Sequence, residues 1–221
     1  MKKLLVFVVL LSLAAAGCNH HRRSEVQGSG KRERQKRDVA SFTSISTEGD
    51  FNIEVVCQKD LSLQVEGDDN VLAFVTSDVS GNVLRIKNTK SYSLNEPVTF
   101  KISVPNLEGI SVTGAGKIEI SGVNNDKFEI DSNGAPAISV SGATKVVDID
   151  SNGAAKIDTH NLRAARGVVE SKGVSKVDIA VAEQLDVTVS GPSQVTYKGD
   201  PVVNKTIHGP GKVEKRGNEG A

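Results

Sequence analysis

Aromatic and chemically reactive side chains are scarce in this 221-residue chain. It has no Trp, two Tyr, six Phe, two Cys and four His. Aromatic platforms for stacking sugar rings are therefore few, and two cysteines make neither a disulfide framework nor a four-cysteine metal site. No HExxH, P-loop or G-x-S-x-G motif occurs. We therefore predict a protein that is not an enzyme and has no catalytic, metal-binding or cofactor-binding residue.

Residues 1–17 have the composition of an export signal. Two lysines precede the apolar run Leu4 to Leu13, which is shorter than a spanning helix requires, and the small residues Ala14 to Gly17 follow. Cys18 comes next, and the string LAAAGC resembles the lipobox of bacterial lipoproteins, whose cysteine is acylated after cleavage. We predict a lipoprotein signal peptide and lipidation at Cys18, for instance with palmitate. The alternative is an ordinary signal peptide that is cleaved nearby.

Residues 18–38 are strongly basic, with seven Lys or Arg against Glu25, Glu33 and Asp38. This composition is too polar to bury a core, so we predict a disordered tether. Behind a lipid anchor the nearest polyanion is a membrane or an envelope polymer, and no nucleic-acid partner is expected. From Asp38 onward 18 basic and 25 acidic residues leave a net charge of about −7.

The stretch from Ile110 to Gly217 repeats one short unit six times. Its anchors are glycines 20, 19, 20, 18 and 18 residues apart: Gly114, Gly134, Gly153, Gly173, Gly191 and Gly209. Four residues later come Ile118, Ile138, Ile157, Val177, Val195 and Val213. Four residues earlier come Ile110, Ile130, Ile149, Val169, Val187 and, breaking the column, Lys205. Self-similarity at a fixed period is typical of repeat architectures.

Each unit alternates apolar and polar residues on both sides of its glycine, which indicates two strands joined by a tight turn. One unit is too short to bury an apolar face alone, so neighbouring units must stack. We predict an all-β fold: a right-handed parallel β-solenoid of about six 18–20-residue rungs after an N-terminal β region. A sandwich or barrel remains the alternative.

Two further columns follow from the same offsets. The residues directly after the anchors are small or rigid, as a turn requires: Ala115, Ala135, Ala154, Val174, Pro192 and Pro210. The residues two before the anchors share the parity of the aliphatic columns and are predicted to point inward: Val112, Ser132, Ser151, Ser171, Val189 and Ile207.

Charged residues fill the outward positions. Carboxylates recur at two offsets, as Asp131, Asp150 and Glu170 and as Glu129, Asp148 and Asp186. Lysines recur on the other strand as Lys117, Lys156, Lys176 and Lys212. Aligned carboxylates are one way to hold Ca²⁺, but no Asp-Gly-Asp loop of known calcium geometry is present. We therefore favour a solvated charged face.

Residues 40–105 form a first β region of five alternating segments, with one or two helical turns at 70–76. We expect it to cover the N-terminal end of the stack, which would otherwise expose an unpaired edge. Cys57 continues the inward parity of Phe51, Ile53 and Val55, so we predict a buried thiol.

The succession DFNIEV, LQVEGDDN, GNVLRIKN and VTFKISVPNLEGISVTGAGKIEISG, followed by glycine-anchored repeats, resembles the putative auto-transporter adhesin family with the head GIN domain. The resemblance covers about Val39 to Gly217, so we place this domain at 39–217 and a C-terminal tail at 218–221. It implies an exported, repeat-built β domain in bacterial envelopes and supplies no catalytic motif.

These observations predict a non-enzymatic, lipid-anchored protein of the bacterial cell envelope, at the outer membrane, which presents a rigid β surface to an envelope or surface macromolecule. The alternative is a polysaccharide-acting enzyme, because β-solenoids include such enzymes. Only analogy of fold supports that alternative.

Overall fold

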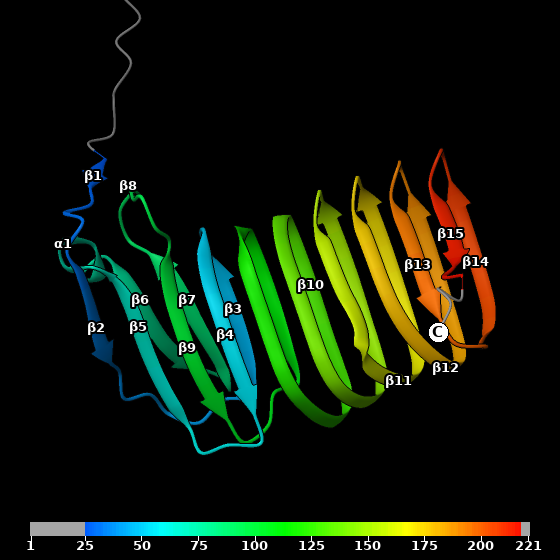
Figure 1. Ribbon diagram of the computed structural model, residues 1–221, viewed down its shortest axis with the longest axis horizontal. Coiled ribbons are helices and arrows are strands. Elements are labelled where there is room, and N and C mark those ends of the chain that lie inside the picture. The colour runs from blue at the N-terminus through cyan, green and yellow to red at the C-terminus, as the bar shows by residue number, and fades with distance from the viewer. Residues whose placement is uncertain (1–24, 218–221) are drawn as a thin grey trace, which may run out of the picture.

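The computed structural model describes residues 25–217 as an elongated molecule built almost entirely from β-strands (Figure 1). Residues 1–24 and 218–221 are outside this description. The prediction of an all-β chain is confirmed. The elements are β1 (Val26–Gln27), β2 (Arg32–Lys36), β3 (Ser44–Glu48), β4 (Phe51–Cys57), β5 (Ser62–Asp68), α1 (Asp69–Leu72), β6 (Val75–Ser80), β7 (Val83–Asn88), β8 (Tyr92–Ser93), β9 (Val98–Val104), β10 (Gly109–Gly153), β11 (Lys156–Gly173), β12 (Lys176–Ser190), β13 (Gln194–Lys198), β14 (Val202–His208) and β15 (Lys212–Lys215).

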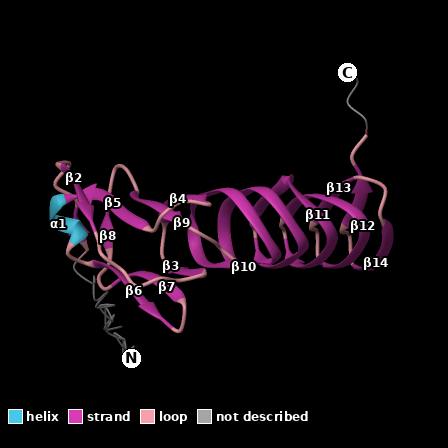
Figure 2. Cartoon of the chain, turned by 90° about the horizontal axis from the view of Figure 1, so that it is seen from below, coloured by secondary structure: helices cyan, strands magenta, loops and turns pink. Residues whose placement is uncertain are grey.

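From β10 to β15 the chain coils repeatedly, and each turn pairs in parallel with the next (Figure 2). The pairing follows the sequence repeat. Ile138 lies beside Ile157, Ile157 beside Val177, Val177 beside Val195, and Val195 beside Val213. Residues that share an offset from the anchor glycine therefore share a column in space.

The two aliphatic columns form the core of this stack and are buried. The serines of the inward column are buried between them, where Ser151 Oγ lies 2.7 Å from Ser175 Oγ. The prediction of an inward side chain is wrong for Ile207, which is 38% exposed. Ile207 lies on β14, and among the described residues no further strand pairs with β14 beyond β12.

The anchor glycines stack directly on one another. Gly153 has φ +130°, and a Cβ built there would lie 2.3 Å from the backbone oxygen of Gly134. A side chain would meet both a disfavoured backbone conformation and a clash with backbone of the previous rung. Glycine is therefore required at the anchor positions if neighbouring rungs are to approach each other at β-sheet spacing.

The N-terminal β region supplies a further rung of the same kind. Gly49 lies beneath Gly114, with Ile45 and Ile53 four residues to either side, and β3 and β4 pair in parallel with β10. Strands β7 and β9 continue the parallel pairing on the far side of β3 and β4, as expected for a region that covers the end of the stack.

Beyond β7 and β9 the pairing becomes antiparallel, through β6 on one side and β5 and β2 on the other. The helical segment predicted at 70–76 is shorter than expected, because α1 ends at Leu72 and β6 begins at Val75. Phe51 and Phe100 pack edge to face at a ring distance of 5.6 Å.

The prediction of a disordered tether at 18–38 is wrong for residues 25–37, which we call the N-terminal clasp. Its strand β2 pairs antiparallel with β5, and β1 pairs with β8. The basic side chains compensate for the low apolar content because they find partners on the body. Arg37 donates to the carbonyl oxygens of Val75 at 2.8 Å and Leu72 at 3.1 Å.

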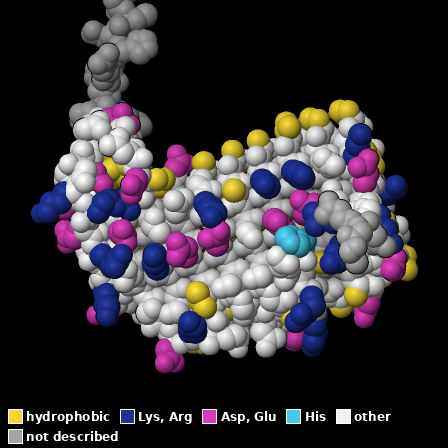
Figure 3. Space-filling view, in the orientation of Figure 1, with side chains coloured by type: hydrophobic (Ala, Val, Ile, Leu, Met, Phe, Trp, Pro, Cys, Tyr) yellow, Lys and Arg dark blue, Asp and Glu magenta, His cyan; other side chains and the backbone are white. Residues whose placement is uncertain are grey.

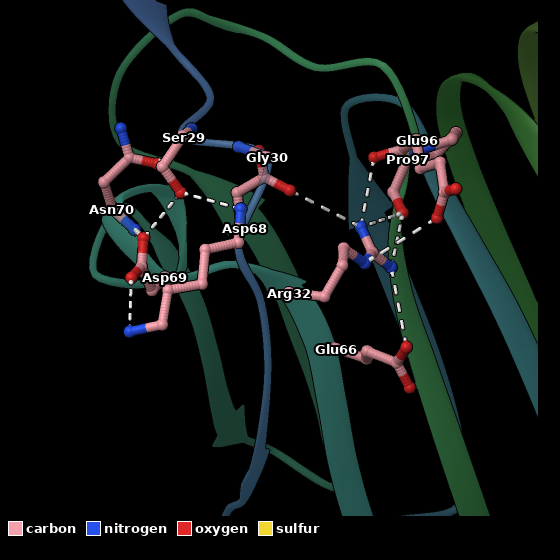
Figure 4. Close-up of polar contacts among 10 residues, drawn as sticks. Ser29, Gly30, Arg32, Glu66, Asp68, Asp69, Asn70, Glu96 and Pro97 are labelled. Atoms are coloured by element: carbon pink, nitrogen blue, oxygen red, sulfur yellow. Dashed lines mark hydrogen bonds and ion pairs between the residues drawn. The ribbon is translucent and has the colours of Figure 1, made fainter.

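Carboxylates of β5 hold the other end of the clasp (Figure 4). The buried Asp68 accepts a hydrogen bond from the backbone N–H of Gly30 at 2.8 Å and lies 3.8 Å from the Arg32 guanidinium. Arg34 donates to Glu66 at 2.8 Å, and this hydrogen bond lowers the pKa of Glu66. With the clasp included, residues 25–217 carry 23 basic and 26 acidic residues, a net charge of −3.

Candidate functional site

The first predicted acidic column exists on the outer surface of the stack. Asp150 lies in register with Glu170, and Asp131 occupies the same offset one rung earlier. Partial burial, with the charges of Asp150 and Glu129 adding to it, raises the pKa of Asp131. Lys172 forms an ion pair with Glu170 at 2.6 Å.

The second predicted column is interrupted. Asp148 and Asp186 both lie in register with Val168, which is 41% exposed and separates them. Lys127 bridges two rungs, since it forms ion pairs with Glu129 and, at 3.2 Å, with Asp148. Within residues 25–217, no group of three or more His, Cys, Asp or Glu side chains is arranged to hold a metal ion.

The edge of the stack at the anchor glycines carries two parallel rows (Figure 3). The outer row, which we call the apolar ridge, consists of Ala115, Ala135, Ala154, Val174, Pro192 and Pro210. The row beside it, which we call the lysine row, consists of Lys117, Lys156, Lys176 and Lys212. Ala137 and Gln194 occupy the same column in the two rungs that have no lysine at this position.

Further down the face with the lysine row, His160 and Asp158 form a pair. The His160 ring hydrogen bonds to Asp158, and its backbone N–H donates to the same carboxylate at 3.1 Å. Burial alone would raise the pKa of Asp158, but the hydrogen bonds from His160 lower it. Asp178, one rung on, accepts a hydrogen bond from Arg216 at 3.0 Å. No Ser, Thr or Cys side chain hydrogen bonds to the His160 ring among the described residues, so the pair is not arranged as a nucleophile and base.

A shallow hollow of about 360 Å³ adjoins His160. Its floor is apolar, with Ala164 and Val181, and its rim includes Arg163 and Lys198. The sequence did not predict this feature because the β11–β12 register shifts between Thr159 and Arg163, so offsets from the glycine no longer give the neighbours there.

The predictions for the two cysteines have different outcomes. Cys57 is 4% exposed, and burial raises the pKa of its thiol to about 11, which confirms the predicted buried apolar thiol. Cys18, the predicted lipidation site, lies outside the described residues. Within 25–217 no helix is long and apolar enough to cross a membrane.

The family model described as "Putative auto-transporter adhesin, head GIN domain" matches residues 41–201. The chain belongs to this family. The match confirms the resemblance drawn from the sequence, and it leaves the N-terminal clasp outside the matched span. Among curated proteins, no significant match to this GIN-domain chain is found.

Solved structures share the fold of this GIN-domain chain. A putative adhesin from Bacteroides fragilis NCTC 9343 is 24% identical, with a TM-score of 0.73 over 86% of this chain and 100% of that one. A putative lipid binding protein from Parabacteroides distasonis ATCC 8503 is 19% identical, with a TM-score of 0.53 over 87% of this chain and 100% of that one.

Proposed function

We propose that this chain is a non-enzymatic, lipid-anchored protein of the bacterial cell envelope, held at the outer membrane through acylated Cys18, whose β-repeat body binds another envelope or surface macromolecule in the manner of an adhesin. The family description supports the adhesin-like role. The sequence pattern around Cys18 supports the anchor.

The observation that carries the proposal is the in-register parallel pairing of successive repeats. We infer that the stack is a right-handed parallel β-solenoid. Side chains at one offset then recur at roughly 4.8 Å intervals on a rigid support. Binding to such a preorganised surface loses little conformational entropy.

The anchor is tested by metabolic labelling with a fatty-acid probe. We expect the wild-type protein to be labelled and Cys18→Ser to be unlabelled. Equal labelling of both proteins would remove the lipoprotein part of the proposal and leave the binding role of the body to be judged separately.

The binding role is tested by capture from envelope extracts, using the chain from residue 19 so that the clasp is kept. Charged contacts weaken with ionic strength, so a specific partner should be eluted by salt. The matched bait carries Asp131→Asn and Asp150→Asn in the acidic column. If both baits capture the same material in equal amounts, this column is not the binding surface.

A further inference from the structure

The C-terminal end of the stack is an open sheet edge. Strand β14 pairs with β12 on one side, and no strand in residues 25–217 pairs with its other side (Figure 1). An edge strand leaves backbone N–H and C=O groups unpaired, and these groups accept a further strand. At this edge Val202 is 68% exposed and Ile207 is 38% exposed. The end of the stack therefore offers both backbone groups and apolar side chains to a partner.

The side chains of β14 continue the core of the stack. Every second residue lies in register with a buried aliphatic residue of β12: Val203 with Leu185, Lys205 with Val187, and Ile207 with Val189. In-register side chains of neighbouring strands lie on the same face of a sheet. A strand that pairs with β14 therefore places its own side chains beside these three and extends the core by one layer.

Lys205 occupies a column that is aliphatic in every earlier rung. The five earlier members are buried: Ile110, Ile130, Ile149, Val169 and Val187. Lys205 is exposed, it is the only Lys, Arg, Asp or Glu of β14, and it takes part in no ion pair within residues 25–217. A charge on the core-facing side of an edge strand opposes pairing with another strand. The sequence therefore places one unpaired charge at the centre of an otherwise receptive edge.

The charge acts directly against a second copy of this chain, whose β14 is equally open. Antiparallel pairing of two β14 strands over residues 202–208 is symmetric about Lys205. It places Val203 opposite Ile207 of the second copy, and it places the two Lys205 side chains opposite each other. Like charges directly opposite destabilise a strand pair, and burial against the core without a partner adds to the cost. Shifting the register by two residues places each Lys205 opposite Val203 or Ile207 and leaves both charges unpaired.

We propose that β14 is a docking edge for an extended protein segment that places a carboxylate opposite Lys205 and aliphatic side chains opposite Val203 and Ile207, and that Lys205 excludes a second copy of this chain. Backbone pairing supplies the affinity, and the charge at one position selects the partner. The selection lies in β14, because β15 at the same end carries charges of both signs. The proposal is independent of the lipid anchor and of the acidic columns.

Exclusion of a second copy is tested by sedimentation equilibrium of the chain from residue 19. Wild type should be a monomer, and Lys205→Val should be a dimer, because a symmetric contact closes at two copies. Two buried charges are removed per dimer, so the dissociation constant should fall by about a hundredfold or more. The matched control is Lys176→Val, the same substitution on β12, a strand that is paired on both sides. This control should stay a monomer.

The position of the contact is tested by hydrogen exchange and by a second substitution. Amides of β14 should exchange more slowly in the Lys205→Val dimer than in the wild-type monomer, whereas those of β6, at the other end of the molecule, should not change. Lys205→Val combined with Ile207→Lys returns a charge to the same face of β14 and should restore the monomer. Thermal melting shows whether each variant is folded.

Selection of a carboxylate is tested by exchanging the charge. Lys205→Glu alone should be a monomer, because two carboxylates repel as two lysines do. Mixed with an equal amount of wild type, it should form a one-to-one complex that salt weakens, since each Lys205 then faces a carboxylate.

Four results would overturn the proposal: a monomeric Lys205→Val that is folded, equal dimerisation of Lys176→Val, a dimer of Lys205→Glu alone, or a mixture that stays monomeric. None of them bears on labelling of Cys18 or on capture through the acidic column, so the proposed function is judged separately.

Discussion

The repeat stack and the N-terminal region are held together in different ways. In the stack, residues 109–215, each rung pairs with the next through the backbone, and columns of Ile and Val, together with Phe128, fill the layers. In the N-terminal region, residues 25–104, the larger side chains Phe51 and Phe100 fill the core, and arginines of the clasp bind backbone carbonyls and carboxylates.

The difference follows from position. A middle rung has a similar neighbour on each side, so repetition alone satisfies its backbone. The first layers must change from parallel stacking to an edge that ends the sheet, and antiparallel β2 with its charged side chains does this. The stack therefore depends on backbone approach at glycine, and the N-terminal region depends on particular side chains.

The largest expected effect comes from filling an anchor in the middle of the stack. Gly153→Val adds side-chain atoms against the Gly134 backbone as well as strain at positive φ, and we expect the free energy of unfolding to fall by about 4 kcal/mol. The matched control is Gly209→Val, where the nearest atom to a Cβ is 3.7 Å away. At Gly209 only the backbone strain remains, so Gly209→Val should lower the free energy of unfolding by less than half as much as Gly153→Val. Equal losses measured by denaturant unfolding would contradict direct stacking of the anchors.

The next effect concerns the clasp. Arg37→Met keeps much of the apolar stem and removes the hydrogen bonds to Leu72 and Val75, so we expect a loss of about 2 kcal/mol. Arg34→Met removes an exposed pair with Glu66 and should cost under about 1 kcal/mol. If Arg37→Met melts at the wild-type temperature, the Arg37 hydrogen bonds do not contribute to holding the clasp on the body.

A smaller effect should appear at alkaline pH. The pKa of Cys57 is about 11 in the folded chain against 9.0 for an ordinary thiol. Stability from the neutral buried thiol is complete below pH 9 and declines as pH rises from 9 to 11, by about 1 kcal/mol at pH 10. Cys57→Val should flatten this part of the stability curve. Tyr92, with its pKa raised to about 12, adds a decline of the same sign above pH 10 that Cys57→Val does not remove. Identical slopes for both proteins between pH 9 and 10 would refute the assignment to Cys57.

The smallest effect is expected from a chelator. Lys127 and Lys172 form ion pairs with carboxylates of the acidic columns, and no group in residues 25–217 is arranged to hold a metal ion, so EDTA should leave the melting temperature unchanged. A decrease that Ca²⁺ reverses would make Asp131 and Asp150 candidate calcium ligands.

The sequence predicted the stack well because residues of one type that recur at one offset from the anchor glycines occupy one column in space. Ile118 and its five equivalents are all buried as expected. The rung at Gly49 was missed, although Ile45 and Ile53 carry the same spacing. The inserted residues 58–108 separate Gly49 from Gly114 by 65 positions, which hides the period.

The amino-acid composition led to the wrong prediction of disorder for the clasp. A polar, basic strand can be ordered by residues elsewhere in the chain that bind it. Asp68 and Glu66 lie more than 30 residues from the arginines they bind, and no local pattern links them. The apolar ridge was present in the sequence as turn residues, but that these form one exposed edge beside the lysine row follows only from the stacking.

The central claim is that the body binds and does not catalyse, and incubation of the chain from residue 19 with a panel of envelope and host polysaccharides tests it most directly. Reducing ends and unsaturated products are measured over time. Catalysis requires a positioned acid, base or nucleophile. Among the described residues, the His160 ring hydrogen bonds to Asp158 and not to a Ser, Thr or Cys side chain. We predict no product above the protein-free control. Saturable product formation that one point substitution abolishes would contradict the account and identify a polysaccharide-acting enzyme.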